Sequence, residues 1–140
     1  MKLDLTSLRK ALSDLEESLG HFSSELAKDP SLRRTLMSAC IQSFEFTFEL
    51  AIKLMKRQLE LILPSQSNVD HMLFMDLIRS AAEAGLIDDV ARYRTYREKR
   101  NITSHTYDQA KAEEIMAVLP DFRDDVRRLL AELERKNRDD

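Results

Sequence analysis

Residues 31–63 contain no glycine and no proline, and this uninterrupted stretch most constrains what the chain can fold into. Asp29-Pro30 precedes it, a pair typical of a helix start, with Asp as the N-cap and Pro in the first turn. Pro64 follows it and cannot continue a helix. The sequence therefore predicts one helix from Pro30 to about Leu63, which is long for a small globular protein.

The remaining sequence also predicts helices, because only 2 glycines and 3 prolines occur among 140 residues, 34% of which are charged. Apolar residues at alternating spacings of three and four predict a first helix over about 4–28 and a last helix from about 109 to 135. Asp108 as N-cap and a capping box from Thr106 to Gln109 start the last helix, and Pro120 is expected to kink it. Shorter helices are expected over about 69–84, ended by Gly85, and over 89–100, capped by Asp88.

The middle of the long helix, FEFTFELA at 44–51, is apolar on nearly every side. Such a helix is buried on more than one side, so we expect it at the centre of the bundle and at a subunit interface. The predicted fold class is all-α, an up-and-down bundle of four to five helices that dimerises through its long helices. Residues 1–135 form one domain, and 136–140 form a frayed tail.

Composition excludes several classes of function. A net charge of -3 argues against binding nucleic acid over the whole surface, so any contact with RNA requires a local patch. Cys40 is the single cysteine, which excludes an intrachain disulfide and fits a reducing cytosol. No signal peptide and no apolar run long enough to span a bilayer are evident, so we expect a cytoplasmic protein with no membrane partner.

Histidine and glycine usage bears on metals and cofactors. His21, His71 and His105 are far apart and match no metal-ligand spacing. Two glycines leave little room for a loop that cradles phosphate. We therefore expect no metal site and no bound cofactor.

Residues 100–107, RNITSHTY, combine groups suited to phosphodiester chemistry. The planar cation of Arg100 fits phosphate oxygens, and His105 can transfer protons near neutral pH. Tyr107 offers a hydroxyl, while Asn101 and Ser104 are supporting polar groups. The alternative is a polar turn whose His and Tyr only cap helix ends.

Spacing constrains how Arg100 and His105 act together. On one continuous helix, five residues separate the two side chains by roughly 140°. They converge only if the helix ends between them, or if one of them comes from another chain. RNA cleavage without metal also needs both a base and an acid, and one His105 does not easily serve as both. A twofold dimer supplies two copies, which is a reason to expect a homodimer if the chain is a nuclease.

Charged residues elsewhere are candidates for a cleft or an interface. Glu45, Glu49 and Lys53 follow one face of the long helix, and the alternative is a structural salt bridge. Five basic residues crowd the helix before the motif, and they either attract phosphates or form a solvated face. These are Arg92, Arg94, Arg97, Lys99 and Arg100. Tyr93 and Tyr96 are expected to pack in the bundle.

Three blocks in order carry a resemblance to a known family: FEFTFELA at 44–51, AAEAGLI at 81–87 and RNITSHTYD at 100–108. Over about residues 5–130 the chain resembles the HEPN-fold proteins encoded beside minimal nucleotidyltransferases, usually named nucleotidyltransferase substrate-binding proteins. The resemblance implies a dimerising helical bundle and a cognate minimal nucleotidyltransferase as partner. In one branch the HEPN protein is a metal-independent ribonuclease toxin.

In that branch the arginine and histidine matching Arg100 and His105 carry RNA cleavage. The partner transfers AMP from ATP onto the tyrosine matching Tyr107. ATP is thus a substrate of the partner and not a cofactor of this chain. The resemblance therefore implies the toxin of a toxin–antitoxin pair. Two alternatives remain open: a non-catalytic subunit that binds substrate or nucleotide for the transferase, and a structural helical adaptor.

Overall fold

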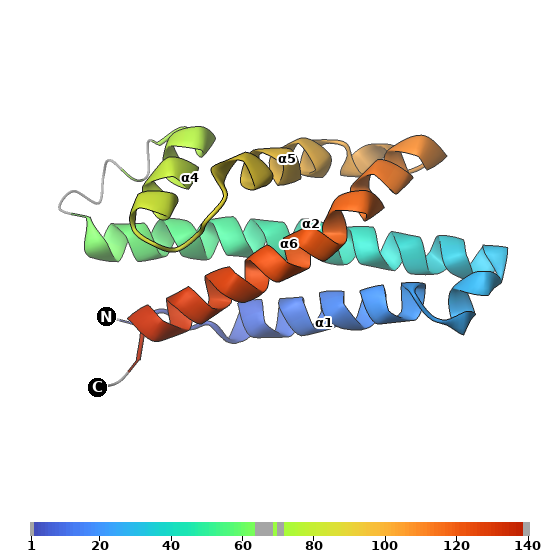
Figure 1. Cartoon of the computed structure of the whole chain (residues 1–140), viewed down its shortest axis with the longest axis horizontal. Coiled ribbons are helices and arrows are strands. Elements are labelled where there is room, and N and C mark those ends of the chain that lie inside the picture. Colours follow the sequence, from blue (N-terminus) through green and yellow to red (C-terminus); the bar gives the residue numbers. More distant parts are fainter. Residues whose placement is uncertain (1, 64–68, 70–71, 139–140) are drawn as a thin grey trace.

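The computed structural model describes residues 2–63, 69 and 72–138, and this part of the chain forms an all-α bundle. Its elements are α1 (Thr6–Phe22), the 3-10 turn η1 (Glu25–Lys28), α2 (Pro30–Ile62), α4 (Phe74–Glu83), α5 (Val90–Asn101), the 3-10 turn η2 (Thr103–His105) and α6 (Gln109–Lys136). Figure 1 shows α1 beside α2, α6 crossing α2 obliquely, and α4 and α5 along another side of α2. The predicted all-α bundle is confirmed.

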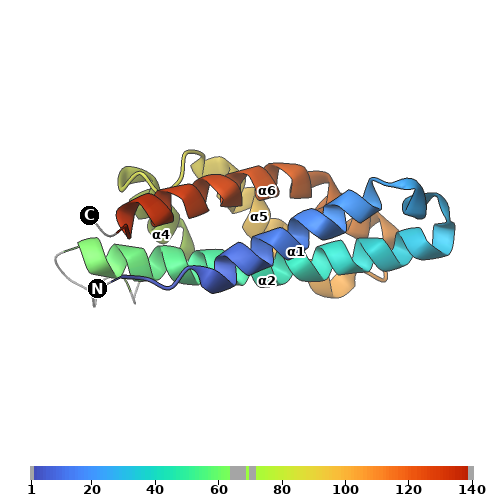
Figure 2. The same ribbon diagram turned by 90° about the horizontal axis from the view of Figure 1, so that it is seen from below.

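The long helix α2 is the element on which the others pack, as predicted. Asp29 caps it, because its side-chain oxygen accepts hydrogen bonds from the backbone N–H groups of Ser31 at 2.8 Å and Leu32 at 3.2 Å. Over 33 residues it spans roughly 50 Å, and it contacts α1, α4, α5 and α6. Figure 2 shows that it extends along nearly the whole molecule.

Aromatic rings of α2, α5 and α6 pack together within a largely aliphatic core. Phe44 meets Phe122 edge to face at 4.8 Å between ring centroids, and Tyr96 meets Phe122 at 5.1 Å. Tyr93 and Tyr96 are each 1% exposed, so both tyrosines pack in the bundle as expected. Phe46, in contrast, is 58% exposed, so the middle of α2, although buried on more than one side as predicted, stays uncovered on one side.

The first helix is shorter than the prediction. It ends at Phe22 and not near Lys28, and a separate 3-10 turn follows it. The hydroxyl of Ser24 donates to the carbonyl of His21 at 2.6 Å and accepts from the N–H of Leu26 at 3.2 Å. Such side-chain bonds compete with the helical ladder and end the helix, which leaves Leu26 at 48% exposure.

The ends of α4 and α5 also differ in detail from the prediction. Within the described residues α4 begins at Phe74, and the expected start near Val69 falls largely outside them. Gly85 ends α4 with a φ of 79°, which is why glycine suits this position. Asp89, and not Asp88, caps α5 by accepting from the N–H of Arg92 at 3.0 Å, because Asp88 binds Arg128 at 2.7 Å.

The last helix begins as predicted but without the expected capping box. Asp108 accepts from the N–H groups of Ala110 and Lys111 at 2.9 and 3.4 Å. The amide of Gln109 turns instead to Glu113, at 3.3 Å. The helix continues through the exposed Pro120 to Lys136.

The C-terminal end of α6 is held to α2 and to the N-terminal segment. Asn137, which we expected in the frayed tail, donates to the buried Gln58 at 2.8 Å and accepts from the backbone N–H of Leu3 at 3.0 Å. Three parts of the chain that are far apart in sequence therefore meet at one amide. Among the described residues no helix is long and apolar enough to cross a bilayer.

Candidate functional site

The candidate residues lie around the point where α5 ends. The backbone leaves the helix at Ile102, and the single 3-10 turn η2 follows before α6. Two β-branched residues, Ile102 and Thr103, come at this point, and both types are weak helix formers. Arg100 therefore belongs to α5 and His105 to η2, so the helix does end between them, as one of the two predicted routes to convergence requires.

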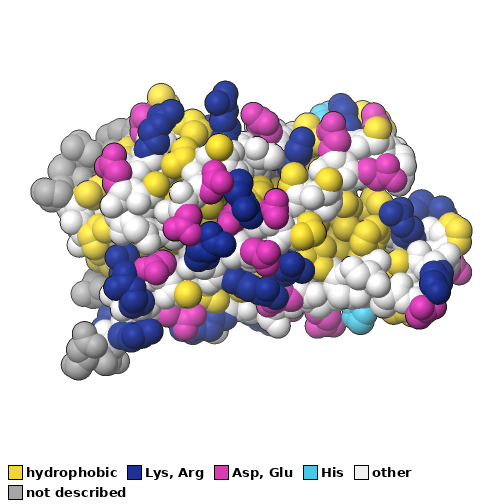
Figure 3. Space-filling model, viewed as in Figure 1, with side chains coloured by type: hydrophobic (Ala, Val, Ile, Leu, Met, Phe, Trp, Pro, Cys, Tyr) yellow, Lys and Arg dark blue, Asp and Glu magenta, His cyan; other side chains and the backbone are white. Residues whose placement is uncertain are grey.

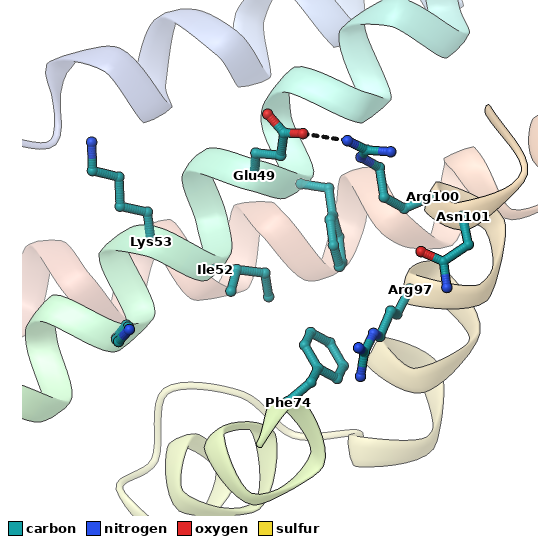
Figure 4. Close-up of a pocket in the computed structure, with 9 residues that line it drawn as sticks. Glu49, Ile52, Lys53, Phe74, Arg97, Arg100 and Asn101 are labelled. Carbon is teal, nitrogen blue, oxygen red and sulfur yellow. Dashed lines mark hydrogen bonds and ion pairs between the residues drawn. The ribbon is translucent and has the colours of Figure 1, made fainter. Parts of the chain in front are cut away.

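Arg100 is held by two carboxylates of α2. Its guanidinium lies 2.5 Å from Glu49 Oε1, a contact marked in Figure 4. It also lies 3.5 Å from Glu45 Oε2. The two glutamates are one helical turn apart, so both face the same side of α2. The two glutamates of the expected charge line of α2 thus pair with Arg100 of α5, which makes them part of the candidate site.

Thr103 completes this arrangement, although the sequence analysis did not single it out. Its hydroxyl donates to Glu45 Oε2 at 2.6 Å, and it lies 3.4 Å from the guanidinium of Arg100. Arg100 Nε is buried and donates to no acceptor in the described part of the chain. The guanidinium is therefore fixed along one edge, while the side chain as a whole stays 32% exposed.

His105 and Tyr107 form a second group. The Tyr107 hydroxyl lies 3.4 Å from His105 Nδ1, and the two rings meet at 71° with 6.0 Å between centroids. Tyr107 is 85% exposed, while His105 is half-buried. A tyrosine hydroxyl in this position can orient the imidazole and is itself open to chemistry from solvent.

Three neighbouring hollows surround these groups. Arg100 and Asn101 line a cleft of about 530 Å³ between α2, α4 and α5, which we call the cationic cleft. Its lining comprises Phe48, Glu49, Ile52, Lys53, Lys56, Phe74, Arg97, Arg100 and Asn101. Glu45 and Ser104 line a second hollow, and Tyr107 lines a third, between α2 and the start of α6.

Within one chain the structure therefore brings together some of the candidates only. Arg100 meets Glu45 and Glu49, and His105 meets Tyr107, but no described contact joins the arginine to the histidine. The helix break is thus not sufficient to place both groups in one hollow. The second predicted route, a contribution from another chain, stays open.

The other basic residues of α5 have separate roles. Arg94 faces Glu98 at 3.8 Å on the surface, whereas Arg97 stacks over the ring of Phe74 at 4.6 Å. Arg92 binds the buried Asp125 at 2.9 Å. The predicted patch is therefore partly structural, and of these side chains only Arg97 joins Arg100 in the cleft.

Asp125 anchors a polar network inside the bundle. It accepts a short hydrogen bond from the hydroxyl of Tyr96, which also lies near Arg92. Burial, followed by the hydrogen bond to Asp125, raises the pKa of Tyr96 above its ordinary value. The network joins α5 to α6 and stabilises the helix that carries Arg97 and Arg100.

Metal ligands do not gather in the described part of the chain, where no group of three or more His, Cys, Asp or Glu side chains is placed to hold an ion. His71 lies outside the described residues. On the face seen in Figure 3, acidic and basic side chains are interspersed, and apolar atoms are exposed beside the first turns of α6.

Fold and site together define a class: an all-α bundle with an arginine, a histidine and a tyrosine at the connection between its last two helices. Residues 3–135 match the family described as "nucleotidyltransferase substrate binding protein like", and the chain belongs to that family. The resemblance inferred from the three sequence blocks is thereby confirmed.

Two matches from Haemophilus influenzae, one to a sequence and one to a solved structure, support this assignment. The chain is 39% identical over 142 residues to a protein named "Probable ribonuclease HepT", with 99% of this chain and 97% of the relative covered. It also matches a solved structure described as the fold of a substrate-binding domain of a nucleotidyltransferase. That match has a TM-score of 0.90 and 38% identity, and it covers 94% of this chain and 99% of the other.

Proposed function

We propose that the protein is a metal-independent RNA endonuclease, the toxin of a pair whose antitoxin is a minimal nucleotidyltransferase. The observation that carries the proposal is the Tyr107 hydroxyl at 3.4 Å from His105 Nδ1, directly after the helix that presents Arg100. The name of the ribonuclease relative, which covers the full chain, supports it. Both partners would act in the cytoplasm, where RNA and ATP are available.

The chemistry follows from the groups present. In RNA cleavage the 2′-hydroxyl attacks the adjacent phosphorus, the O2′–P bond forms and the P–O5′ bond breaks. The His105 of one copy takes the proton of the 2′-hydroxyl through Nε2, while the Nδ1–H of the same ring donates to the Tyr107 hydroxyl. Arg100 stabilises the charge that develops on the phosphoryl oxygens, and Asn101 and Ser104 supply neutral donors nearby.

The leaving 5′-oxygen needs a proton, and we assign it to a protonated His105 of a second copy. This assignment removes the difficulty that Arg100 and His105 share no hollow within one chain. The exposed Phe46, with the part of Leu50 that the core leaves uncovered, offers an apolar surface on α2 for that copy. The proposed active form is therefore a homodimer.

The partner transferase would inactivate the ribonuclease by modifying Tyr107. Its oxygen attacks the α-phosphorus of ATP on the partner transferase, pyrophosphate leaves, and the phenolic proton passes to a base of the partner. The product places a phosphodiester and an adenosine beside His105, where the phosphate of RNA has to lie. An 85% exposed tyrosine can reach the site of another protein without unfolding.

The decisive test measures RNA cleavage in the presence of EDTA. Arg100→Ala and His105→Ala should both abolish cleavage, while Arg94→Ala on the same helix and His21→Ala should retain it. Retained cleavage in either Arg100→Ala or His105→Ala, with an unchanged melting temperature, refutes the assignment. Intact mass after co-expression with the transferase should show AMP units that map to Tyr107.

The second candidate is a non-catalytic subunit that binds nucleotide or substrate for the transferase. The family description and the 530 Å³ cleft favour it. It requires a stable complex that modifies a third molecule and does not depend on Tyr107. Absence of AMP addition and of cleavage, with the complex intact, would establish this candidate in place of the first.

A further inference from the structure

The cationic cleft has the size and the lining of a ligand site. Its volume of about 530 Å³ falls within the usual range of small-ligand pockets. Its walls come from three helices, with Glu49, Ile52 and Lys53 on α2, Phe74 on α4 and Arg97 on α5 (Figure 4). Segments far apart in sequence therefore meet around one open cavity.

The cleft contains a cation–π stack and a second aromatic ring. The guanidinium of Arg97 lies over the ring of Phe74 at 4.6 Å, and the second ring, Phe48, lies 6.1 Å from Phe74. Arg97 as a whole is exposed, which leaves its guanidinium accessible to a ligand. Guanidinium planes and aromatic rings are the groups on which unpaired nucleobases stack.

The charge of the lining is strongly positive. Four of its nine residues are cationic, and Glu49 is the single acidic one. Glu49 is paired with Arg100, whereas Lys53 and Arg97 have no carboxylate partner in the described part of the chain. A cleft with unneutralised cations beside a stacking plane fits an anionic ligand that carries flat rings.

We propose that the cationic cleft is a subsite for single-stranded RNA, which holds the nucleotide next to the cleaved phosphate. The base stacks on Arg97 above Phe74, and the following backbone phosphate contacts Lys53. Arg100 and Asn101 line the same cleft, so a strand lying in it can reach the arginine assigned to the cleaved phosphate. The subsite rests on the proposed ribonuclease function and extends it to substrate recognition.

The variants separate stacking from charge. Arg97→Ala and Phe74→Leu should each weaken RNA binding about fivefold or more, the usual loss when a stacking partner is removed. Arg97→Lys keeps the charge but not the plane, so it should restore little of this loss. Lys53→Ala should reduce the salt dependence of log Kd by about 0.7, as expected for one phosphate contact to a single strand.

Binding is measured by fluorescence anisotropy in the His105→Ala background, with a short single-stranded RNA, the same RNA as a duplex, and AMP. The control is Arg94→Ala, an exposed arginine of the same helix. The affinity for single-stranded RNA should be clearly higher than the affinity for the duplex and for AMP. Unchanged affinity in Arg97→Ala and Lys53→Ala, or equal affinity for AMP and the strand, overturns the subsite.

Cleavage kinetics distinguish this inference from the function on which it rests. In the otherwise unaltered enzyme, Arg97→Ala should raise KM and leave kcat within about twofold of its original value. If Arg100→Ala abolishes cleavage but Arg97→Ala leaves KM unchanged, the subsite is wrong and the ribonuclease stands. If the protein never cleaves but binds strands through Arg97 and Phe74, the ribonuclease is wrong, and the cleft is a strand-binding site without a cleaved phosphate beside it.

Discussion

Glu49 forms an ion pair with the guanidinium of Arg100, the group that the proposed mechanism uses to bind the RNA phosphate. Its carboxylate lies 2.5 Å from Arg100, so an RNA phosphate has to displace it before the arginine can bind the substrate. The substitution Glu49→Gln removes the charge but nearly keeps the size of the side chain. We expect it to strengthen RNA binding, which is an unusual result for a change inside a candidate active site.

Exposure sets the size of this effect. Glu49 is 57% and Arg100 32% exposed, so water screens the pair. Ion pairs of this kind contribute about 0.2–1 kcal/mol, which corresponds to a decrease in KM of about 1.4-fold to fivefold. The free energy of unfolding should fall by no more than the same amount, since Glu45 and Thr103 still hold Arg100.

The assay compares KM and kcat for RNA cleavage in Glu49→Gln and in the unaltered protein, at one fixed salt concentration. Glu114→Gln is the matched control, because it removes one exposed negative charge from α6 and the described contacts include none to this carboxylate. A lower KM in Glu49→Gln alone supports the reasoning. A loss of kcat approaching that of Arg100→Ala would refute it, because Glu49 would then be needed to position the arginine in the reaction.

Three further predictions concern stability and assembly. Asn137→Ala should lower the free energy of unfolding by about 1–3 kcal/mol, because Gln58 and Leu3 lose their partner, and an unchanged urea midpoint would contradict this. Stability should fall as pH rises from 9 to 10, because burial raises the pKa of Cys40 to about 11 and only the unfolded chain ionises there. Urea unfolding at both pH values should show this fall in the unaltered protein and a smaller one in Cys40→Ala. Phe46→Arg should convert the proposed dimer to a folded monomer in light scattering, since this ring is 58% exposed and lies outside the buried core, and a persistent dimer would rule out this face of α2.

Much of the fold could be predicted from local signals. Asp29-Pro30 and Asp108 act within one helical turn of themselves, and Gly85 takes a backbone conformation that suits glycine alone. The predicted cap of α5 was wrong because two neighbouring residues could serve as its N-cap. Asp88 and Asp89 are equally suited to cap α5, and the choice depends on Arg128 from α6.

The candidate site was predictable only in part, for a similar reason. Arg100, His105 and Tyr107 lie within one short stretch, so the sequence could single them out as candidates. The pairing of Arg100 with Glu49 depends on how α2 is positioned against α5, which no local pattern specifies. Phe74 joins the cleft through α4, and its spacing reads as an ordinary core position.

The amide of Asn137 also determines how the two ends of the molecule can be used in experiments. Because it binds near Leu3, both ends of the described chain lie together at one extremity, and the α5–α6 connection lies toward the other (Figure 1). A tag, fluorophore or surface anchor attached at either end therefore leaves the face around Tyr107 open. The protein can be immobilised by its ends and still present that face to RNA, to ATP-loaded transferase or to a second copy.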